Sequence, residues 1–264
     1  MKLSDITPVI LTRNEAPNIA RNLDKLRWAQ DIVVVDSFST DETCTAASAY
    51  NNIRLYEREF DNHANQWNFA ISETNIRTEW ILALDADYIL ADDFSEELQG
   101  LIPPSDVCGY EARFRYCVGG KPLRASLYAP VVVLYRKTSA HYVQDGHTQR
   151  LRISENIAML TSYILHDDRK TTETWIRNQT AYAAREAEKL SATAWGKLDA
   201  MDRIRRMYIL APPVVFVGSL IVKGLILDGA YGLHYATQRA LFETILSLQL
   251  LEAHLKKKSS NKKA

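Results

Sequence analysis

Residues 80–87 read WILALDAD, an apolar run that ends in two carboxylates separated by one alanine. Residues 32–36 read IVVVD, a second unbroken apolar run that also ends in an aspartate. Continuous apolar runs of this length predict strands that are buried on both faces. Similar runs at 6–11 and 53–56 predict two more strands, and helix patterns beginning near residues 19, 42 and 66 alternate with them. This alternation predicts a parallel sheet covered by helices, an α/β fold.

The chain changes character twice beyond this region. From residue 110 it contains short segments typical of strands (110–118, 131–135 and 150–153), which predict a mixed or antiparallel second half. Beyond residue 165 the pattern is helical, and the apolar run 207–222 is shorter than the roughly 20 residues of a secure membrane span. We therefore expect one domain over residues 1–165 and a helical extension over residues 166–264.

The composition is that of an ordinary globular protein. The 264 residues carry 32 Lys and Arg against 32 Asp and Glu, and the three cysteines lack the spacing of a metal site. A disulfide scaffold and a low-complexity linker are thereby excluded. Because no long apolar signal core precedes the first predicted strand, we expect a cytoplasmic protein.

Basic charge is concentrated at the carboxyl terminus, where five of the last nine residues are lysines and none is acidic. Proteins that bind duplex nucleic acid spread basic charge over a folded face, so we expect no nucleic-acid partner. An anionic membrane surface fits better. An apolar and basic segment precedes this tail and predicts peripheral attachment to the inner face of the cytoplasmic membrane. Its residues are Arg203, Arg205, Arg206, Tyr208, Phe216, Leu220, Lys223 and Leu225. The alternative is a helical hairpin packed on the first domain or a dimer interface, so a homo-oligomer is compatible with the sequence.

Polar residues follow the two central strands. Asp85 and Asp87 can present oxygens to a hard divalent cation that also binds substrate phosphates, although a solvated turn is the alternative. Asp36 can accept a hydrogen bond from a base or a ribose, and hydroxyls such as Ser39 can donate to nearby oxygens. The alternative for that loop is an N-capping role. Because the chain has neither GxGxxG nor a P-loop, a bound nucleotide must be held in another way.

Four motifs occur in order: VILTRNE at 9–15, IVVVDSFSTDET at 32–43, QWNFA at 66–70 and WILALDAD at 80–87. Together they resemble glycosyltransferase family 2, in the branch similar to bacterial lipopolysaccharide-core glucosyltransferases. The resemblance implies a GT-A fold, a nucleoside-diphosphate sugar donor, UDP as the nucleotide, a Mg or Mn ion, and inversion at the anomeric carbon. It also implies site roles. The residues that it places nearest the nucleoside are Thr12, Asn14, Glu15 and Asp36. Those that it places nearest the diphosphate and metal are Asp85 and Asp87, and the residues that approach the diphosphate are Gln66 and Asn68.

An inverting transfer needs a base that takes the proton of the acceptor hydroxyl. The corresponding segment of the lipopolysaccharide-core branch reads His-Glu, whereas residues 144–150 read QDGHTQR here, with Thr148 in place of the glutamate. Because a threonine cannot be the base, Asp145 is the candidate, unless the base lies elsewhere. His147 is expected to complete the metal shell, approach the diphosphate or orient Asp145. Residues 166–169, HDDR, are a second acid-base candidate, with an exposed ion-pair turn as the alternative.

These observations predict a metal-dependent inverting glycosyltransferase that acts on a glycan or lipid-linked acceptor in cell-surface polysaccharide or lipopolysaccharide synthesis. Two other classes remain open. A nucleotidyltransferase would also combine an α/β fold with metal-held phosphates, but it would release pyrophosphate. A catalytically inactive module that binds the membrane surface is the second, because Thr148 replaces the expected base.

Overall fold

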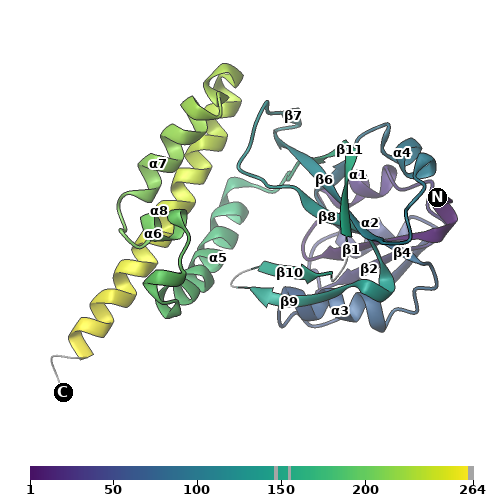
Figure 1. Ribbon diagram of the computed structural model, residues 1–264, viewed down its shortest axis with the longest axis horizontal. Coiled ribbons are helices and arrows are strands. Elements are labelled where there is room, and N and C mark those ends of the chain that lie inside the picture. Colours follow the sequence, from purple (N-terminus) through teal and green to yellow (C-terminus); the bar gives the residue numbers. More distant parts are fainter. Residues whose placement is uncertain (146–147, 154–155, 261–264) are drawn as a thin grey trace. The chain divides into compact units, whose positions relative to one another are not determined.

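The computed structural model describes residues 1–145, 148–153 and 156–260 of the chain (Figure 1). The chain divides into two compact units. The first unit comprises residues 1–122 and 128–170, and the second comprises 123–127 and 171–264. The sequence placed this boundary at residue 165, and the structure places it at residue 170.

A mixed sheet forms the first unit. Its strands are β1 (Ile6–Thr12), β2 (Ile32–Asp36), β3 (Ile53–Glu57), β4 (Trp80–Asp85), β5 (Tyr88–Leu90), β6 (Val107–Val118), β7 (Lys121–Pro122), β8 (Val131–Arg136) and β11 (Asn156–His166). In the described residues the strand order is β3-β2-β1-β4-β8-β6-β11-β5, and β7 pairs with β6. The first four strands are parallel, whereas β8 runs antiparallel to β4 and β6, and β5 antiparallel to β11. The structure confirms the predicted α/β class, with a parallel first half and a mixed second half.

Both faces of the central strands are buried. Successive side chains of a strand point to opposite faces, so Ile10 and Val34 pack on one side of the sheet and Val9 and Val33 on the other. The first side is covered by α1 (Ile19–Asp24), α2 (Thr43–Ser48) and α4 (Phe94–Gly100). The second is covered by α3 (His63–Ser72) and the hairpin of β9 (His141–Asp145) and β10 (Thr148–Arg152). Burial on both faces explains why these strands are unbroken apolar runs.

The second unit is helical, as expected from the sequence. Its elements are α5 (Thr172–Ala192), α6 (Ala200–Arg205), α7 (Ala211–Val217), α8 (Ala230–Ser260), a π-helical turn (Gly218–Val222) and 3₁₀ turns at Trp195–Lys197 and Leu225–Asp228. Ala183 and Leu190 of α5 pack against Leu246 and Leu250 of α8. Among the described helices, none combines the length and apolar character that crossing a bilayer demands.

Candidate active site

The carboxyl ends of β1, β2 and β4 meet at one edge of the sheet. In the parallel pairing, Thr12 is the partner of Asp36, and Leu11 is the partner of Asp85. Open α/β sheets bind ligands beyond the carboxyl ends of their strands. The structure therefore brings three of the predicted site residues, Thr12, Asp36 and Asp85, to the edge where a ligand is expected.

Asp36 organises the loop that follows β2. Its carboxylate is fully buried and accepts hydrogen bonds from the Thr12 hydroxyl (2.6 Å), the Ser39 main-chain N–H (2.6 Å) and the Ser39 hydroxyl (2.6 Å). A carboxylate offers roughly four acceptor positions, so most of its capacity is used within the protein. Asp36 thus fixes the conformation of the loop. The structure brings Thr12, Asp36 and Ser39 together, and their predicted roles at a nucleoside stay predictions.

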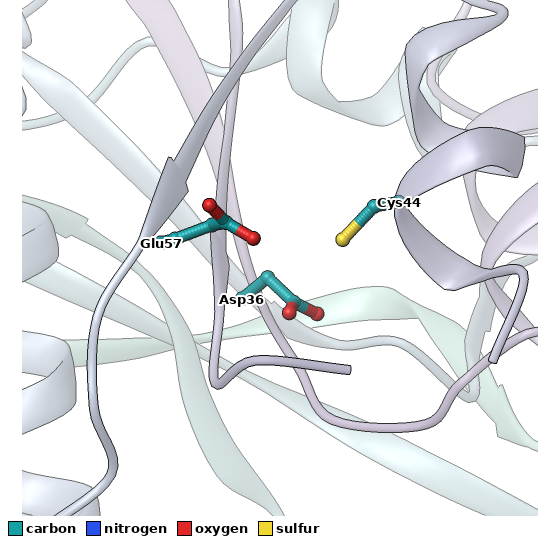
Figure 2. A group of neighbouring side chains, drawn as sticks. All are labelled: Asp36, Cys44 and Glu57. Carbon is teal, nitrogen blue, oxygen red and sulfur yellow. The ribbon is translucent and has the colours of Figure 1, made fainter. Parts of the chain in front are cut away.

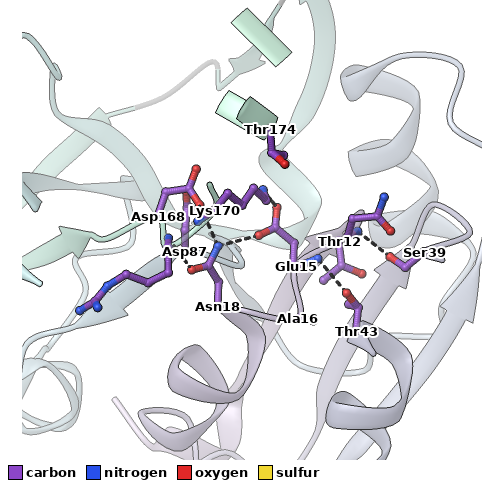
Figure 3. Close-up of polar contacts among 12 residues, drawn as sticks. Thr12, Glu15, Ala16, Asn18, Ser39, Thr43, Asp87, Asp168, Lys170 and Thr174 are labelled. Carbon is purple, nitrogen blue, oxygen red and sulfur yellow. Dashed lines mark hydrogen bonds and ion pairs between the residues drawn. The ribbon is translucent and has the colours of Figure 1, made fainter. Parts of the chain in front are cut away.

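Asn14 and Glu15 tie the loop after β1 to the loop after β2. The Asn14 main-chain N–H donates to the Ser39 hydroxyl (2.8 Å), and the Asn14 side-chain oxygen accepts from the Thr40 N–H (2.8 Å). The Glu15 N–H donates to the Thr43 hydroxyl (2.7 Å; Figure 3). Asn14 adopts a φ of 54°, a left-handed conformation that asparagine tolerates better than most residues. The two loops form one preorganised surface.

Phe38 is exposed on this surface, and sequence analysis gave it no role. Its side chain is 55% exposed, and its φ of 56° lies in the left-handed region. A bulky residue in that region is a true conformational outlier, and such strain concentrates at ligand sites. The loop therefore holds an aromatic ring outward at an energetic cost.

A group formed by Asp36, Cys44 and Glu57 is shown in Figure 2, with ligand atoms within 4.8 Å of one another. The Asp36 oxygens already accept bonds from Thr12 and Ser39. Burial, followed by the charge of Asp36, raises the pKa of the Cys44 thiol to about 11. Since metals bind the thiolate, a protonated Cys44 is a poor ligand. Asp36 is thus already engaged within the loop, and its acidic surroundings disfavour a free thiolate at Cys44.

Asp85 and Asp87 flank the turn between β4 and β5. The Asn22 side-chain amide holds this turn by donating to the carbonyl oxygens of Asp85 (3.1 Å) and Tyr88 (2.6 Å). At the end of β11, His166 pairs with Tyr88 in the antiparallel ladder, which places His166 Nε2 3.0 Å from Asp87 Oδ2. The structure thus brings His166 directly to the predicted metal-binding pair.

The two carboxylates have opposite electrostatic environments. Burial, together with the charge of Asp87, raises the pKa of Asp85 to about 6. Burial also tends to raise the pKa of Asp87, but the charge and hydrogen bond of His166 outweigh it and lower that pKa. Burial tends to lower the pKa of His166, but the charge of Asp87 outweighs it and raises that pKa. Opposite shifts in neighbouring acids are typical of functional sites.

These residues fit a divalent cation. Carboxylate oxygens are the ligands that Mg and Mn prefer, and a nearby cation favours the ionised form of Asp85, whose pKa burial has raised. The Nδ1 atom of His166 is buried without a hydrogen-bond partner among the described residues. Mg keeps several waters and binds substrate phosphates, so it needs few ligands from the protein.

A buried polar network holds the segment that follows β11 (Figure 3). Asn18 donates to Glu15 Oε2 (2.9 Å) and Asp168 Oδ1 (3.0 Å), and its side-chain oxygen accepts from the Arg169 N–H (2.9 Å). Lys170 forms an ion pair with Glu15, and both side chains are largely buried. Burial raises the pKa of Glu15 to about 7, although the charge of Lys170 opposes that shift. Glu15 is therefore engaged with Lys170, and its predicted role at the nucleoside stays a prediction.

Asp167 is an anchor of the same segment. Its buried carboxylate pairs with Arg21 and Arg169 and accepts a hydrogen bond from the Gly120 N–H (3.1 Å). The exposed ion-pair turn considered for residues 166–169 is therefore wrong. The segment is built into the first unit.

Gln66 and Asn68 of α3 support neighbouring loops. Gln66 is 1% exposed, donates to the Ser37 hydroxyl (3.0 Å) and accepts from Arg58 (2.5 Å). Asn68 donates to the Tyr142 carbonyl and accepts from the Tyr142 N–H, both at 2.9 Å. Gln66 thus buttresses the loop after β2, whereas the Asn68 amide is engaged with β9.

The predicted base and its neighbour cannot be placed. Asp145 ends β9 and pairs through its main chain with Thr148 of β10, but its side chain is not among those described. His147 lies outside the described residues. The roles assigned to Asp145 and His147 stay predictions.

The model of glycosyl transferase family 2 matches residues 7–175. An uncharacterized glycosyltransferase of Rickettsia bellii is 33% identical over 95 residues, 36% of this chain and 31% of that protein, so the chain aligns with less than a third of that relative. The lipopolysaccharide core biosynthesis glycosyltransferase LpsC of Rhizobium meliloti is 23% identical over 97% of this chain and 95% of that protein.

Two solved structures are also similar to this chain. S. aureus TarS 1–349, in complex with UDP-GlcNAc, is 13% identical, with coverage of 94% of this chain and 92% of that chain and a TM-score of 0.49. Glucosyl-3-phosphoglycerate synthase from Mycobacterium tuberculosis, in complex with Mg²⁺ and UDP, is 16% identical, with coverage of 74% and 80% and a TM-score of 0.49. The family assignment rests on the sequence match. Because the family model covers more than half of the chain, from β1 through the Asp85–Asp87 turn to β11, the chain belongs to glycosyltransferase family 2.

Proposed function

We propose that this protein transfers a sugar from a UDP-sugar to a glycan or lipid-linked acceptor, with inversion at the anomeric carbon. One observation carries the proposal: the Asp85–Asp87 turn with His166 lies at the same sheet edge as the loop that Asp36 organises. The first part suits a cation and a diphosphate, and the second suits a nucleoside. The name of LpsC supports a role in lipopolysaccharide core synthesis.

We assign a separate role in the reaction to each of these residues. Asp85 and Asp87, with His166 beside them, would hold the divalent cation, which supplies positive charge against the departing diphosphate. Asn22 keeps the turn in place. The acceptor oxygen forms its bond to the anomeric carbon as the bond to the diphosphate breaks, and the electron pair leaves with the diphosphate. We assign the proton of the acceptor hydroxyl to Asp145.

Asp145→Asn tests the assignment of the base. We expect release of UDP from the donor to fall by about a hundredfold or more, because general-base catalysis is lost. Nucleotide affinity should stay unchanged, since the base faces the acceptor. The measurement is UDP release with a matched sugar donor, and Asp92→Asn, whose side chain is 94% exposed, is the control.

The products also separate the alternatives. Pyrophosphate release by the wild type would identify a nucleotidyltransferase. Full UDP release by Asp145→Asn would place the base elsewhere. An absence of both products and of nucleotide binding would support the inactive module that binds the membrane surface.

Phe38 is proposed to stack on the base of the nucleotide. A ring held outward in a strained conformation is suited to this, because stacking on an aromatic side chain contributes about 1–3 kcal/mol per base. Phe38→Gly should weaken UDP binding by about tenfold or more, whereas Phe38→Tyr should retain it. Since glycine accepts a positive φ, Phe38→Gly should be as stable as the wild type or more stable by up to about 1 kcal/mol.

Two measurements check this expectation. Calorimetric titration with UDP reports the affinity, and urea unfolding reports the stability. A loss of stability in Phe38→Gly with unchanged UDP affinity would show that Phe38 packs within the protein and does not contact the nucleotide.

A further inference from the structure

The segment that contains α7 and the π-helical turn is apolar on two opposite sides. Ala211, Val215 and Ser219 recur every four residues and are buried, so they form the packed side. Val214, Val217 and Ile221 lie on the other side and are 48%, 53% and 61% exposed. A surface helix ordinarily carries polar and charged residues on its solvent side. This segment instead presents an apolar side to the surroundings.

The exposure extends beyond the helix. We use the term exposed apolar face for Ile209, Leu210, Val214, Val217, Ile221, Val222, Ile226 and Leu227, which are 44% to 82% exposed. Scattered apolar side chains are normal on a protein surface, but eight exposed aliphatic side chains within residues 209–227 are a concentration of the kind that marks an interaction site.

The turn at the end of this face is firmly built. Leu225 is fully buried, and Asp228 pairs with Arg124 at 3.1 Å. Gly232 of α8 lies so close that a Cβ atom there would be 1.9 Å from the Leu225 carbonyl oxygen. Because the turn is anchored on its inner side, Ile226 and Leu227 are held outward by the fold.

Positive charge accompanies the exposed apolar face. Residues 203–227 contain four basic residues and no acidic one. Arg205 is engaged in a buried ion pair with Glu243 (2.7 Å), so the exposed cations are Arg203 and Lys223. Arg206 lies over the ring of Trp195, which is 48% exposed. Apolar side chains bordered by cations and an exposed tryptophan are typical of surfaces that enter a lipid headgroup region.

We propose that the exposed apolar face docks on an anionic lipid surface. Its apolar side chains would enter the boundary between headgroups and acyl chains, while Arg203 and Lys223 meet lipid phosphates. A second copy of the chain is a poorer partner. A two-fold contact would bring the same cations of two copies together, with no acid in the segment to offset them.

The structure also corrects the anchor predicted from the sequence. Of the apolar residues named there, Leu225 is buried, and Tyr208, Phe216 and Leu220 are partly buried. Arg205 was named as a surface cation, but it pairs with Glu243. The exposed apolar side chains of this segment are those of the neighbouring residues.

Vesicle co-sedimentation of the full chain tests the proposal. The wild type should bind vesicles of equal parts phosphatidylcholine and phosphatidylglycerol more tightly than vesicles of phosphatidylcholine alone. The double change Ile221→Asn and Val222→Asn should weaken that binding by about tenfold or more, because two apolar side chains no longer enter the lipid. Ile102→Asn, at a residue of the first unit that is 91% exposed, is the matched control and should bind as the wild type does.

Three results would overturn the proposal. They are no binding of the wild type to anionic vesicles, equal binding by the double variant, or a wild-type dimer in solution that the double variant converts to a monomer. If the double variant fails to fold, Ile209→Asn with Leu227→Asn takes its place under the same criteria. UDP affinity should be the same in all variants, so a failure here is distinguishable from a failure of the proposed transferase function.

Discussion

Asp87→Asn lowers sugar transfer by about a hundred- to a thousandfold, because it removes a charge that holds the cation opposite the developing negative charge of the diphosphate. The asparagine keeps the size of the side chain, so the turn held by Asn22 stays in place. The change also removes the negative partner of His166, whose pKa then falls. The measurement is the rate of UDP release with a donor that the wild type accepts.

The matched control for this change is Asp92→Asn. Asp92 lies on the same stretch of chain, its side chain is 94% exposed, and its partner is Lys25 at the surface. We expect Asp92→Asn to retain wild-type activity. Full activity of Asp87→Asn with a proven donor would show that the metal assignment is wrong. Parallel tests of His166→Asn and His147→Asn for loss of manganese affinity would decide which imidazole lies nearer the cation.

Lys170→Met lowers the free energy of unfolding by about 3–5 kcal/mol, because the Glu15 carboxyl loses its buried cation and must either stay charged without a partner or take up a proton as its pKa rises. Glu15 and Lys170 expose only 14% and 13% of their side chains, so water cannot replace the lost partner. The double change Glu15→Gln and Lys170→Met should be less destabilising than Lys170→Met alone, since no buried charge is then left unpaired. Urea unfolding monitored by tryptophan fluorescence gives these values.

Lys25→Met is the control for the ion pair. Its partner Asp92 is exposed, and exposed ion pairs contribute only about 0–1 kcal/mol. If Lys170→Met were no more destabilising than Lys25→Met, the network of Glu15, Asn18 and Asp168 would not hold the segment after β11.

The first half of the fold was predictable because its signal is local. β2 and β4 are unbroken apolar runs that end in Asp36 and Asp85, and parallel pairing then places both aspartates at one edge. The hydrogen bonds that join Asp36 to Thr12 and Ser39 follow from that pairing. Together with family membership, this core accords with the GT-A fold that the four motifs implied.

The missed features depend on contacts between distant parts of the chain. His166 reaches Asp87 only because β11 pairs antiparallel with β5, across 79 residues of sequence. Lys170 reaches Glu15 across 155 residues. No periodicity encodes either contact. The signal that the sequence offered was HDDR at 166–169. An apolar strand that ends in a histidine indicates a candidate site residue as strongly as the strand that ends in Asp85 does.

The conformation of Phe38 and the contacts of Asn68 were missed for different reasons. A positive φ is a property of the folded loop, and the residues around Phe38 do not predict it. Asn68 matched a motif whose polar residues are expected near the diphosphate, and that role stays a prediction; the structure adds that its amide bonds to the main chain of Tyr142 on the β9 strand. Residue type alone does not predict such a contact between two elements.

Calorimetric titration of the purified protein with UDP, with and without manganese, and its repetition on Asp87→Asn, test whether Asp87 helps to hold a cation beside the nucleotide. We expect UDP binding that is tightened by manganese in the wild type, and loss of the manganese effect in Asp87→Asn. Binding that is the same with and without the metal, or an undiminished manganese effect in Asp87→Asn, would contradict this expectation.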